Sequence, residues 1–116
     1  MKPYVLFCLV FILCSFQEDS HLKLRFQNNT GELFKKLDVN ILGAHYVFTD
    51  LKAGKSTKPI RVKGAYRYCY AKLITEQDTL VLQPEDFVGE TLHTKGRLTM
   101  KFIIKVQKGK RFLVIE

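Results

Sequence analysis

Hydrophobic and polar residues alternate with a period of two through much of this sequence. In the clearest run, Leu98, Met100, Phe102, Ile104 and Val106 alternate with Arg97, Thr99, Lys101, Ile103 and Lys105. Successive side chains of a β-strand point to opposite faces, so this spacing predicts a strand with one buried face. No helical period of comparable length follows residue 20. The pattern therefore predicts an all-β fold.

Shorter stretches of the same kind recur along the chain. We expect further strands over residues 21–27, 36–41, 44–50, 59–63, 65–75, 80–82 and 112–115. Pro59 favours a strand start or a sheet edge because it cannot donate to a ladder, and Lys108-Gly109 has the composition of a hairpin tip. About seven or eight short strands at intervals of roughly ten residues predict an antiparallel β-sandwich, immunoglobulin-like or transthyretin-like, with a small barrel as the alternative.

The N-terminal residues differ in composition from the rest of the chain. Lys2 precedes an apolar run over residues 4–13. A short basic head followed by an apolar core of roughly 7 to 15 residues is typical of an export signal, whereas a membrane-spanning helix needs about 20 apolar residues. We therefore expect a signal peptide at residues 1–15 and a single β-sandwich domain at residues 20–116.

Cys14 closes the apolar run and is followed by Ser15 and further polar residues. Here the chain resembles the signals of bacterial lipoproteins, although Leu13 stands where Gly or Ala is usual. The resemblance implies a lipid on the Cys14 thiol, which anchors by burying CH₂ groups at about 0.8 kcal/mol each. The alternative is a signal that is simply cleaved near Cys14 or Ser15. In signal, size and strand pattern the chain resembles the many small uncharacterised lipoproteins of the bacterial cell envelope, which implies a periplasmic or outer-surface location.

The net charge limits the kinds of partner that the chain can bind, and the cysteine count limits how the folded domain can be stabilised. The formal net charge is +8, which is compatible with an acidic partner or an anionic membrane surface. Cys69 is the one cysteine after residue 14, so the domain has no internal disulfide and depends on its core. We expect Cys69 itself to be buried and inert.

No group of residues has the spacing of a catalytic or metal site. The three histidines are scattered, and the carboxylates of residues 85–90 lack a calcium-loop pattern. Gly54-Lys55-Ser56 resembles the core of a phosphate-binding loop, but Thr49 replaces the required first glycine and Pro59 stands where a helix should follow. We expect no catalytic residue, no metal and no cofactor.

Three tyrosines suggest a first binding surface. Tyr66, Tyr68 and Tyr70 share one face of the strand expected over residues 65–75. If that face is exposed, the row suits stacking on sugar rings or docking of a protein. If it points inward, the tyrosines are ordinary core residues.

A basic row suggests a second binding surface. Arg97, Lys101 and Lys105 share one face of the C-terminal strand, and Lys108, Lys110 and Arg111 extend the row. Such a row suits lipid phosphates or an anionic polysaccharide, whereas nucleic acid is not expected without exposed aromatic residues between the cations. The alternative is that the lysines protect an exposed strand from aggregation.

These patterns favour an exported, non-catalytic binding module of the cell envelope, with a glycan, an anionic lipid or a protein as its ligand. The alternatives are a structural or assembly subunit that pairs through an edge strand and, less favoured, an exported enzyme. Asn28-Asn29-Thr30 is a formal glycosylation sequon, which has meaning only in a eukaryote and is otherwise turn composition.

Overall fold

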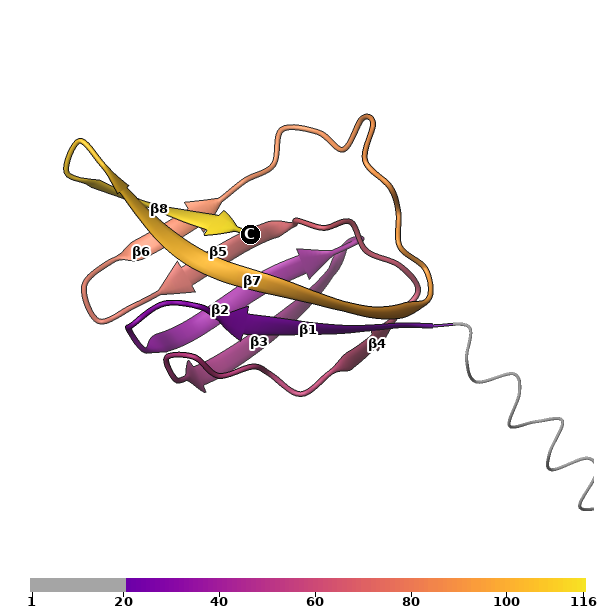
Figure 1. The fold of residues 1–116 in the computed structure, drawn as a ribbon, viewed down its shortest axis with the longest axis horizontal. Coiled ribbons are helices and arrows are strands. Elements are labelled where there is room, and N and C mark those ends of the chain that lie inside the picture. Colours follow the sequence, from indigo (N-terminus) through magenta and orange to yellow (C-terminus); the bar gives the residue numbers. More distant parts are fainter. Residues whose placement is uncertain (1–20) are drawn as a thin grey trace, which may run out of the picture.

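The computed structural model describes residues 21–116, in which β-strands predominate (Figure 1). The strands are β1 (Leu22–Asn28), β2 (Phe34–Ile41), β3 (Ala44–Leu51), β4 (Ile60–Val62), β5 (Tyr70–Ile74), β6 (Thr79–Leu82), β7 (Gly96–Gln107) and β8 (Lys110–Ile115). This part of the chain contains no helix, and therefore none able to cross a membrane. The expected all-β class is confirmed.

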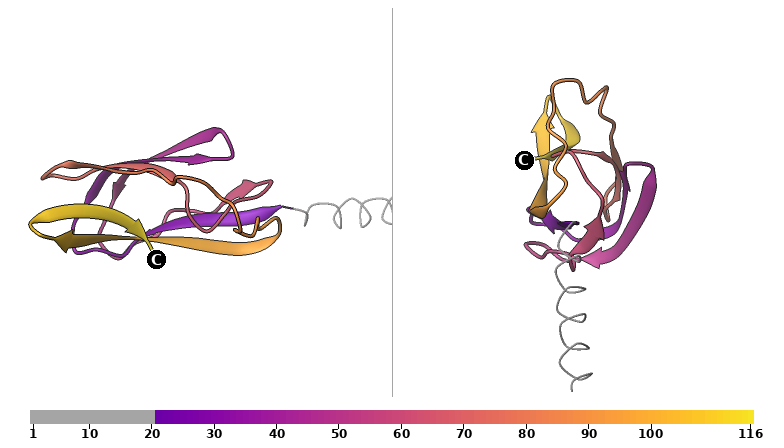
Figure 2. Two further views of the ribbon diagram at one scale, coloured as in Figure 1. Left: turned by 90° about the horizontal axis from the view of Figure 1, so that it is seen from above. Right: turned by 90° about the vertical axis from the view of Figure 1, so that its right-hand side faces the viewer.

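The strands form two four-stranded sheets that lie face to face (Figure 2). One sheet has the order β4-β1-β7-β8 and the other the order β3-β2-β5-β6. The sheets do not close into a barrel, so the small-barrel alternative is wrong. The arrangement is consistent with a sandwich.

One strand pair departs from the expected antiparallel pairing. β1 and β7 run parallel, in a register that extends from Leu22 opposite Gly96 to Asn28 opposite Phe102. The other pairs of named strands are antiparallel. Alternation predicts which face of a strand is buried but not which strand lies beside it, and no hairpin restricts two strands so far apart in sequence. The prediction of a wholly antiparallel fold was therefore wrong at β1 and β7.

A hydrophobic core fills the space between the sheets. From β1 and β7 it takes every second residue, namely Leu22, Leu24, Phe26, Leu98, Met100 and Phe102. The Phe26 ring centroid lies 5.3 Å from that of Phe48 on β3 and 6.0 Å from that of Phe102. Burying each large apolar side chain contributes about 1.5–3 kcal/mol, so these strands hold the two layers together.

The strand expected over residues 65–75 is shorter in the structure. It begins only at Tyr70, because Ala65 instead pairs with His93 through two backbone hydrogen bonds of 2.9 Å. Gly64 permits this close approach, since a Cβ at its position would lie 3.2 Å from the carbonyl oxygen of His93. The three tyrosines have high strand propensity, but this non-local contact prevents a regular ladder.

Two local predictions are confirmed. The strand that follows Pro59 is β4, and it lies at the edge of its sheet. Lys108 and Gly109 connect β7 to β8 with φ angles of 52° and 77°. Positive φ at both positions is the geometry that two-residue hairpins prefer.

Candidate functional site

One candidate site is a pocket of about 410 Å³ at one end of the two sheets. Three segments form it: the β2–β3 turn, the irregular stretch before β5 and the loop after β6, drawn in orange in Figure 1. Its walls are mainly apolar and aromatic, with Asn40 and Gln83 as amide groups. This size and lining are typical of small-molecule sites, which run from about 300 to 1,000 Å³.

An aromatic stack forms one wall of the pocket. The Phe87 ring stacks with those of Tyr66 and Tyr68, with centroids at 4.5 Å and 5.2 Å and interplanar angles of 17° and 20°. Tyr70 also lines the pocket, and all three tyrosines are half-buried. The structure therefore brings the three tyrosines together, but neither as an open row on a strand nor as core residues.

Phe87 is one of the pocket residues that sequence reasoning missed. It lies in the irregular loop that begins at Pro84, where no periodic pattern indicates which way a side chain points. A large apolar residue in a polar loop was the one available signal. Its stacking partners could not be inferred because they lie in another irregular segment.

The hydroxyl of Tyr68 attaches this loop to the pocket wall. It donates a hydrogen bond to the Asp86 carbonyl oxygen at 3.2 Å and lies 3.4 Å from Oε1 of Glu90. Desolvation, followed by the nearby Glu90 carboxylate, raises the pKa of Tyr68 above its ordinary value. The phenol therefore stays neutral at physiological pH and acts as a donor.

The β2–β3 turn places an apolar side chain at the pocket. Leu42 has a φ of 49° and a side chain that is 59% exposed. Left-handed backbone costs a residue with a Cβ roughly 1–2 kcal/mol. Gly43 follows with a φ of 88°, and its N–H donates to Oδ1 of Asn40 at 2.8 Å, which stabilises the turn. The pocket therefore opens beside an exposed aliphatic group.

Cys69 lines the pocket from the core side, and its predicted burial is confirmed. Its Sγ lies 3.7 Å from Sδ of Met100. Burial raises the pKa of Cys69 to about 12, so the thiol stays protonated at neutral pH. A protonated thiol is a poor nucleophile, because the thiolate is the reactive form.

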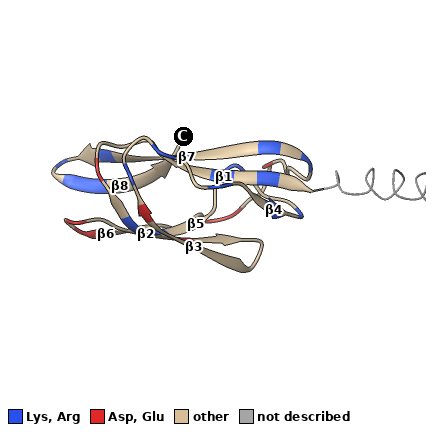
Figure 3. Ribbon diagram, turned by 90° about the horizontal axis from the view of Figure 1, so that it is seen from below, with Lys and Arg blue, Asp and Glu red and all other residues tan. Residues whose placement is uncertain are grey.

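The basic row lies elsewhere, on the β4-β1-β7-β8 sheet, where Figure 3 shows Lys and Arg positions along β1 and β7. These positions alternate with buried residues, so their side chains lie on the outer face of the sheet. Arg97, Lys101 and Lys105 are exposed there on β7. β1 adds Lys23 and Arg25, which sequence reasoning left out because the pairing of β1 with β7 was unknown. The structure thus extends the basic row across two strands.

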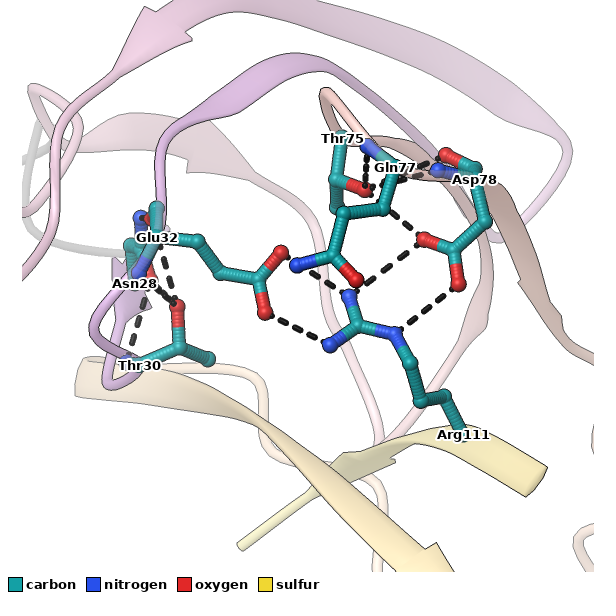
Figure 4. A network of polar contacts seen from close by, with 7 residues as sticks. All are labelled: Asn28, Thr30, Glu32, Thr75, Gln77, Asp78 and Arg111. Carbon is teal, nitrogen blue, oxygen red and sulfur yellow. Dashed lines mark hydrogen bonds and ion pairs between the residues drawn. The ribbon is translucent and has the colours of Figure 1, made fainter. Parts of the chain in front are cut away.

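Arg111 does not belong to this basic face. Its guanidinium binds both carboxylate oxygens of Glu32 at 2.8 Å and Oδ2 of Asp78 at 2.9 Å (Figure 4). Thr75 completes the group, since its hydroxyl donates to Oδ1 of Asp78 at 2.7 Å. These contacts join β8 to the β1–β2 loop and to the β5–β6 turn, and we call this group the Arg111 clasp. The prediction that Arg111 extends the row was wrong.

The Arg111 clasp shifts the pKa values of Asp78 and Arg111. The guanidinium hydrogen bonds, followed by that of Thr75, hold the pKa of Asp78 below its ordinary value. Glu32 and then Asp78 raise the pKa of Arg111. Asp78 and Arg111 therefore hold their charges more firmly in the folded state than in the unfolded chain.

Asn28 lies fully buried at the end of β1. Its Nδ2 donates to the carbonyl oxygens of Glu32 at 2.7 Å and Leu51 at 3.0 Å. Its Oδ1 accepts from the backbone N–H and the hydroxyl of Thr30, at 3.1 Å and 2.6 Å (Figure 4). A glycan cannot be attached to this amide in the folded domain, so the sequon acts as turn structure.

Residues 21–116 show no cluster of three or more His, Cys, Asp or Glu side chains that could hold a metal ion. Cys14 and the expected signal peptide at residues 1–15 lie outside the described residues. The features on which function can be argued are therefore the aromatic pocket and the basic face of a two-sheet all-β domain. Comparison with protein-family models, curated proteins and solved structures finds no match for this chain.

Proposed function

We propose that this chain is an exported, non-catalytic binding module of a bacterial cell envelope that holds a glycan ring in the aromatic pocket. The observation that carries the proposal is the stack of Tyr66, Phe87 and Tyr68 in the wall of a pocket of about 410 Å³. Aromatic rings offer contact area at low entropic cost, and tyrosine adds a hydroxyl at the edge.

The polar groups of the pocket suit a sugar better than a purely apolar ligand. Gln83, Asn40 and the hydroxyls of Tyr66 and Tyr70 supply donors and acceptors around an apolar wall. A sugar ring presents C–H groups on its faces and hydroxyls on its rim. A few polar groups around apolar walls also fix the orientation of a ligand, which is how such pockets obtain specificity.

We also infer that the sandwich is transthyretin-like rather than immunoglobulin-like. In constant-type immunoglobulin domains the first two strands lie in the same sheet, which contains strands A, B, E and D. Here β1 and β2 belong to different sheets. Of the two sandwich types expected from the sequence, this separation supports the transthyretin-like type.

The glycan proposal can be tested by a glycan array followed by titration of the purified protein. The chain contains five tyrosines and no tryptophan, and three of those tyrosines line the pocket. Tyrosine fluorescence therefore reports on the pocket directly. We expect Phe87→Ala to weaken binding about fivefold, because a lost aromatic contact is worth about 1 kcal/mol.

Phe112→Ala provides a matched control for that titration. It makes the same change at a side chain on β8 that is 45% exposed and does not line the pocket. We expect this variant to bind as the wild type does. Equal binding by Phe87→Ala, Tyr66→Ala and the wild type would show that the pocket is not the site.

A second candidate function is assembly through an edge strand. β3 has eight residues and lies at the edge of its sheet, where no named strand within residues 21–116 pairs with its outer side. Val47 on this strand is half exposed. Long apolar edge strands can add a strand from a partner. A chain that binds no glycan but forms defined oligomers in solution would favour this function over the first.

Export and anchoring form a separate part of the proposal. They rest on the apolar run at residues 4–13 and on Cys14, the residue at which a lipid would be attached. We expect the intact mass of membrane-extracted protein to equal residues 14–116 plus a diacylglycerol group on Cys14. A Cys14→Ser variant should lack that mass and leave the membrane fraction. A lipid-free mature chain that starts after Cys14 would contradict anchoring.

A further inference from the structure

A second pocket, of about 190 Å³, lies on the basic face. Its lining residues are Lys23, Arg25, Pro59, Arg97, Leu98 and Thr99. None of them lines the aromatic pocket, so the two sites are separate. Three of the six side chains are cationic and none is a carboxylate.

The parallel pairing of β1 with β7 creates this cationic pocket. Lys23 lies opposite Arg97, and Arg25 lies opposite Thr99. The residues between them, Leu24 and Leu98, point into the core. Alternation then places the polar side chains of both strands together on the outer face.

The arrangement places like charges close together. Lys23 and Arg97 occupy directly opposed positions, where like charges repel and destabilise a sheet. Within residues 21–116 neither side chain forms an ion pair. An anion bound between the two cations would replace this repulsion by attraction.

The Arg25 guanidinium is held in place. Its Nε donates to Oγ1 of Thr99 at 3.0 Å. Its Nη groups make no further hydrogen bond within the described part of the chain, so they can donate to a ligand. A planar guanidinium presents two parallel N–H groups that match the oxygens of a phosphate.

The surroundings of the pocket are also mainly basic. Arg61 on β4 lies opposite Lys23, and Lys101 continues the row on β7. Within residues 21–116, Glu116 brings a carboxylate to the same sheet, since its backbone N–H donates to the Lys101 carbonyl oxygen at 2.8 Å. It lies beside Lys101 and does not line the pocket.

We propose that this pocket binds the phosphate group of a phosphate monoester. Three cations around one small cavity suit a group that carries close to two negative charges at neutral pH. The volume corresponds to about six waters at roughly 30 Å³ each, which accommodates a five-atom oxyanion and some solvent. This inference does not depend on the glycan proposal, which involves other residues and other probes.

Titration of the ¹⁵N-labelled full chain with inorganic phosphate, at constant ionic strength set with chloride, tests the proposal. We expect saturable shifts of the amide signals of Lys23, Arg25, Arg97 and Thr99. The double variant Arg25→Gln/Arg97→Gln should bind phosphate at least about tenfold more weakly, because two charge-assisted contacts are lost.

A second double variant, Lys36→Gln/Lys52→Gln, serves as the matched control. It removes the same charge at exposed positions that do not line the pocket. We expect it to bind phosphate as the wild type does. Phosphate binding that is weakened equally in both double variants would show only general charge attraction and would overturn the proposal. Amide signal shifts that never saturate would overturn it in the same way.

Vesicles distinguish the two sources of such a phosphate. After saturable phosphate binding, cosedimentation with phosphatidylcholine vesicles that contain phosphatidic acid would identify a lipid headgroup. Binding to phosphate without binding to these vesicles would identify a soluble phosphate ester. Equal binding to phosphatidylglycerol vesicles of matched charge, without saturable phosphate binding, would contradict a monoester site.

Discussion

Replacing Asn28 by alanine is expected to lower the unfolding temperature by about 15 °C. The amide donates to two carbonyl oxygens and accepts from Thr30, and the side chain is fully buried. Each buried polar group left without a partner costs about 1–3 kcal/mol, so we expect a loss of about 3 kcal/mol in the free energy of unfolding. In a domain of this size, a loss of 1 kcal/mol in the free energy of unfolding lowers the unfolding temperature by about 4–8 °C. Thermal unfolding followed by circular dichroism measures this change.

Asn29→Ala is the matched control, because Asn29 is the exposed neighbour in the same turn. Its side chain makes no hydrogen bond within residues 21–116, so its unfolding temperature should stay within about 2 °C of the wild type. An Asn28→Ala variant that unfolds at the wild-type temperature would show that the buried amide does not hold this junction together.

An Asn28→Asp variant separates the donor role of the side chain from its acceptor role. Aspartate keeps the acceptor for Thr30 but places a carboxylate against the carbonyl oxygens of Glu32 and Leu51. Desolvation and these two dipoles should raise its folded-state pKa above the unfolded value. The stability deficit relative to the wild type should then be largest at neutral pH and shrink as pH falls.

Hydrophobic alternation predicted most strands because it depends only on which face meets the core. The run from Arg97 to Val106 lies within β7, and the tip at Lys108-Gly109 is correct. Hydrophobic alternation did not predict the start of β5, because a backbone contact between distant segments determines where that strand begins. Ala65 pairs with His93 rather than with a neighbouring strand, and no residue pattern encodes that contact.

The two candidate sites were predictable to different degrees. The basic row on β7 could be read from alternation, but Lys23 and Arg25 join it only through the parallel pairing with β1. The tyrosines were recognisable by type, whereas Phe87 comes from an irregular loop. A pocket that is assembled from three segments depends on tertiary contacts. Hydrophobic periodicity and composition predict secondary structure but not such contacts.

Arg111 shows how one strand position can change the role of a charged residue. On β8 the outer face carries Phe112, while Arg111 and Leu113 point to the inner side. Near the hairpin tip the apolar core has ended, and Arg111 meets Glu32 and Asp78 instead. The sequence places Arg111 beside Lys110, and composition alone assigns both to one basic surface.

Arg111→Met is expected to lower the unfolding temperature by roughly 5–10 °C at neutral pH. The change removes the bidentate contact with Glu32 and the contact with Asp78, and it leaves two carboxylates near each other without a cation. Isolated surface ion pairs contribute little, but here one guanidinium binds two carboxylates with side chains that are only 21–31% exposed. The measurement is thermal unfolding from pH 7 to pH 2.

The pH dependence shows whether the Arg111 clasp causes this loss. Because Arg111 holds the pKa of Asp78 below its ordinary value of 3.8, the folded state gains stability that is fully present above that pH. This stability disappears as pH falls through the lowered pKa, so the wild-type unfolding temperature should decrease over that range. The Arg111→Met curve should be flatter and should approach the wild-type curve at low pH, whereas Lys110→Met should parallel the wild type. A variant curve that stays parallel to the wild type throughout would mean that the carboxylates gain nothing from Arg111.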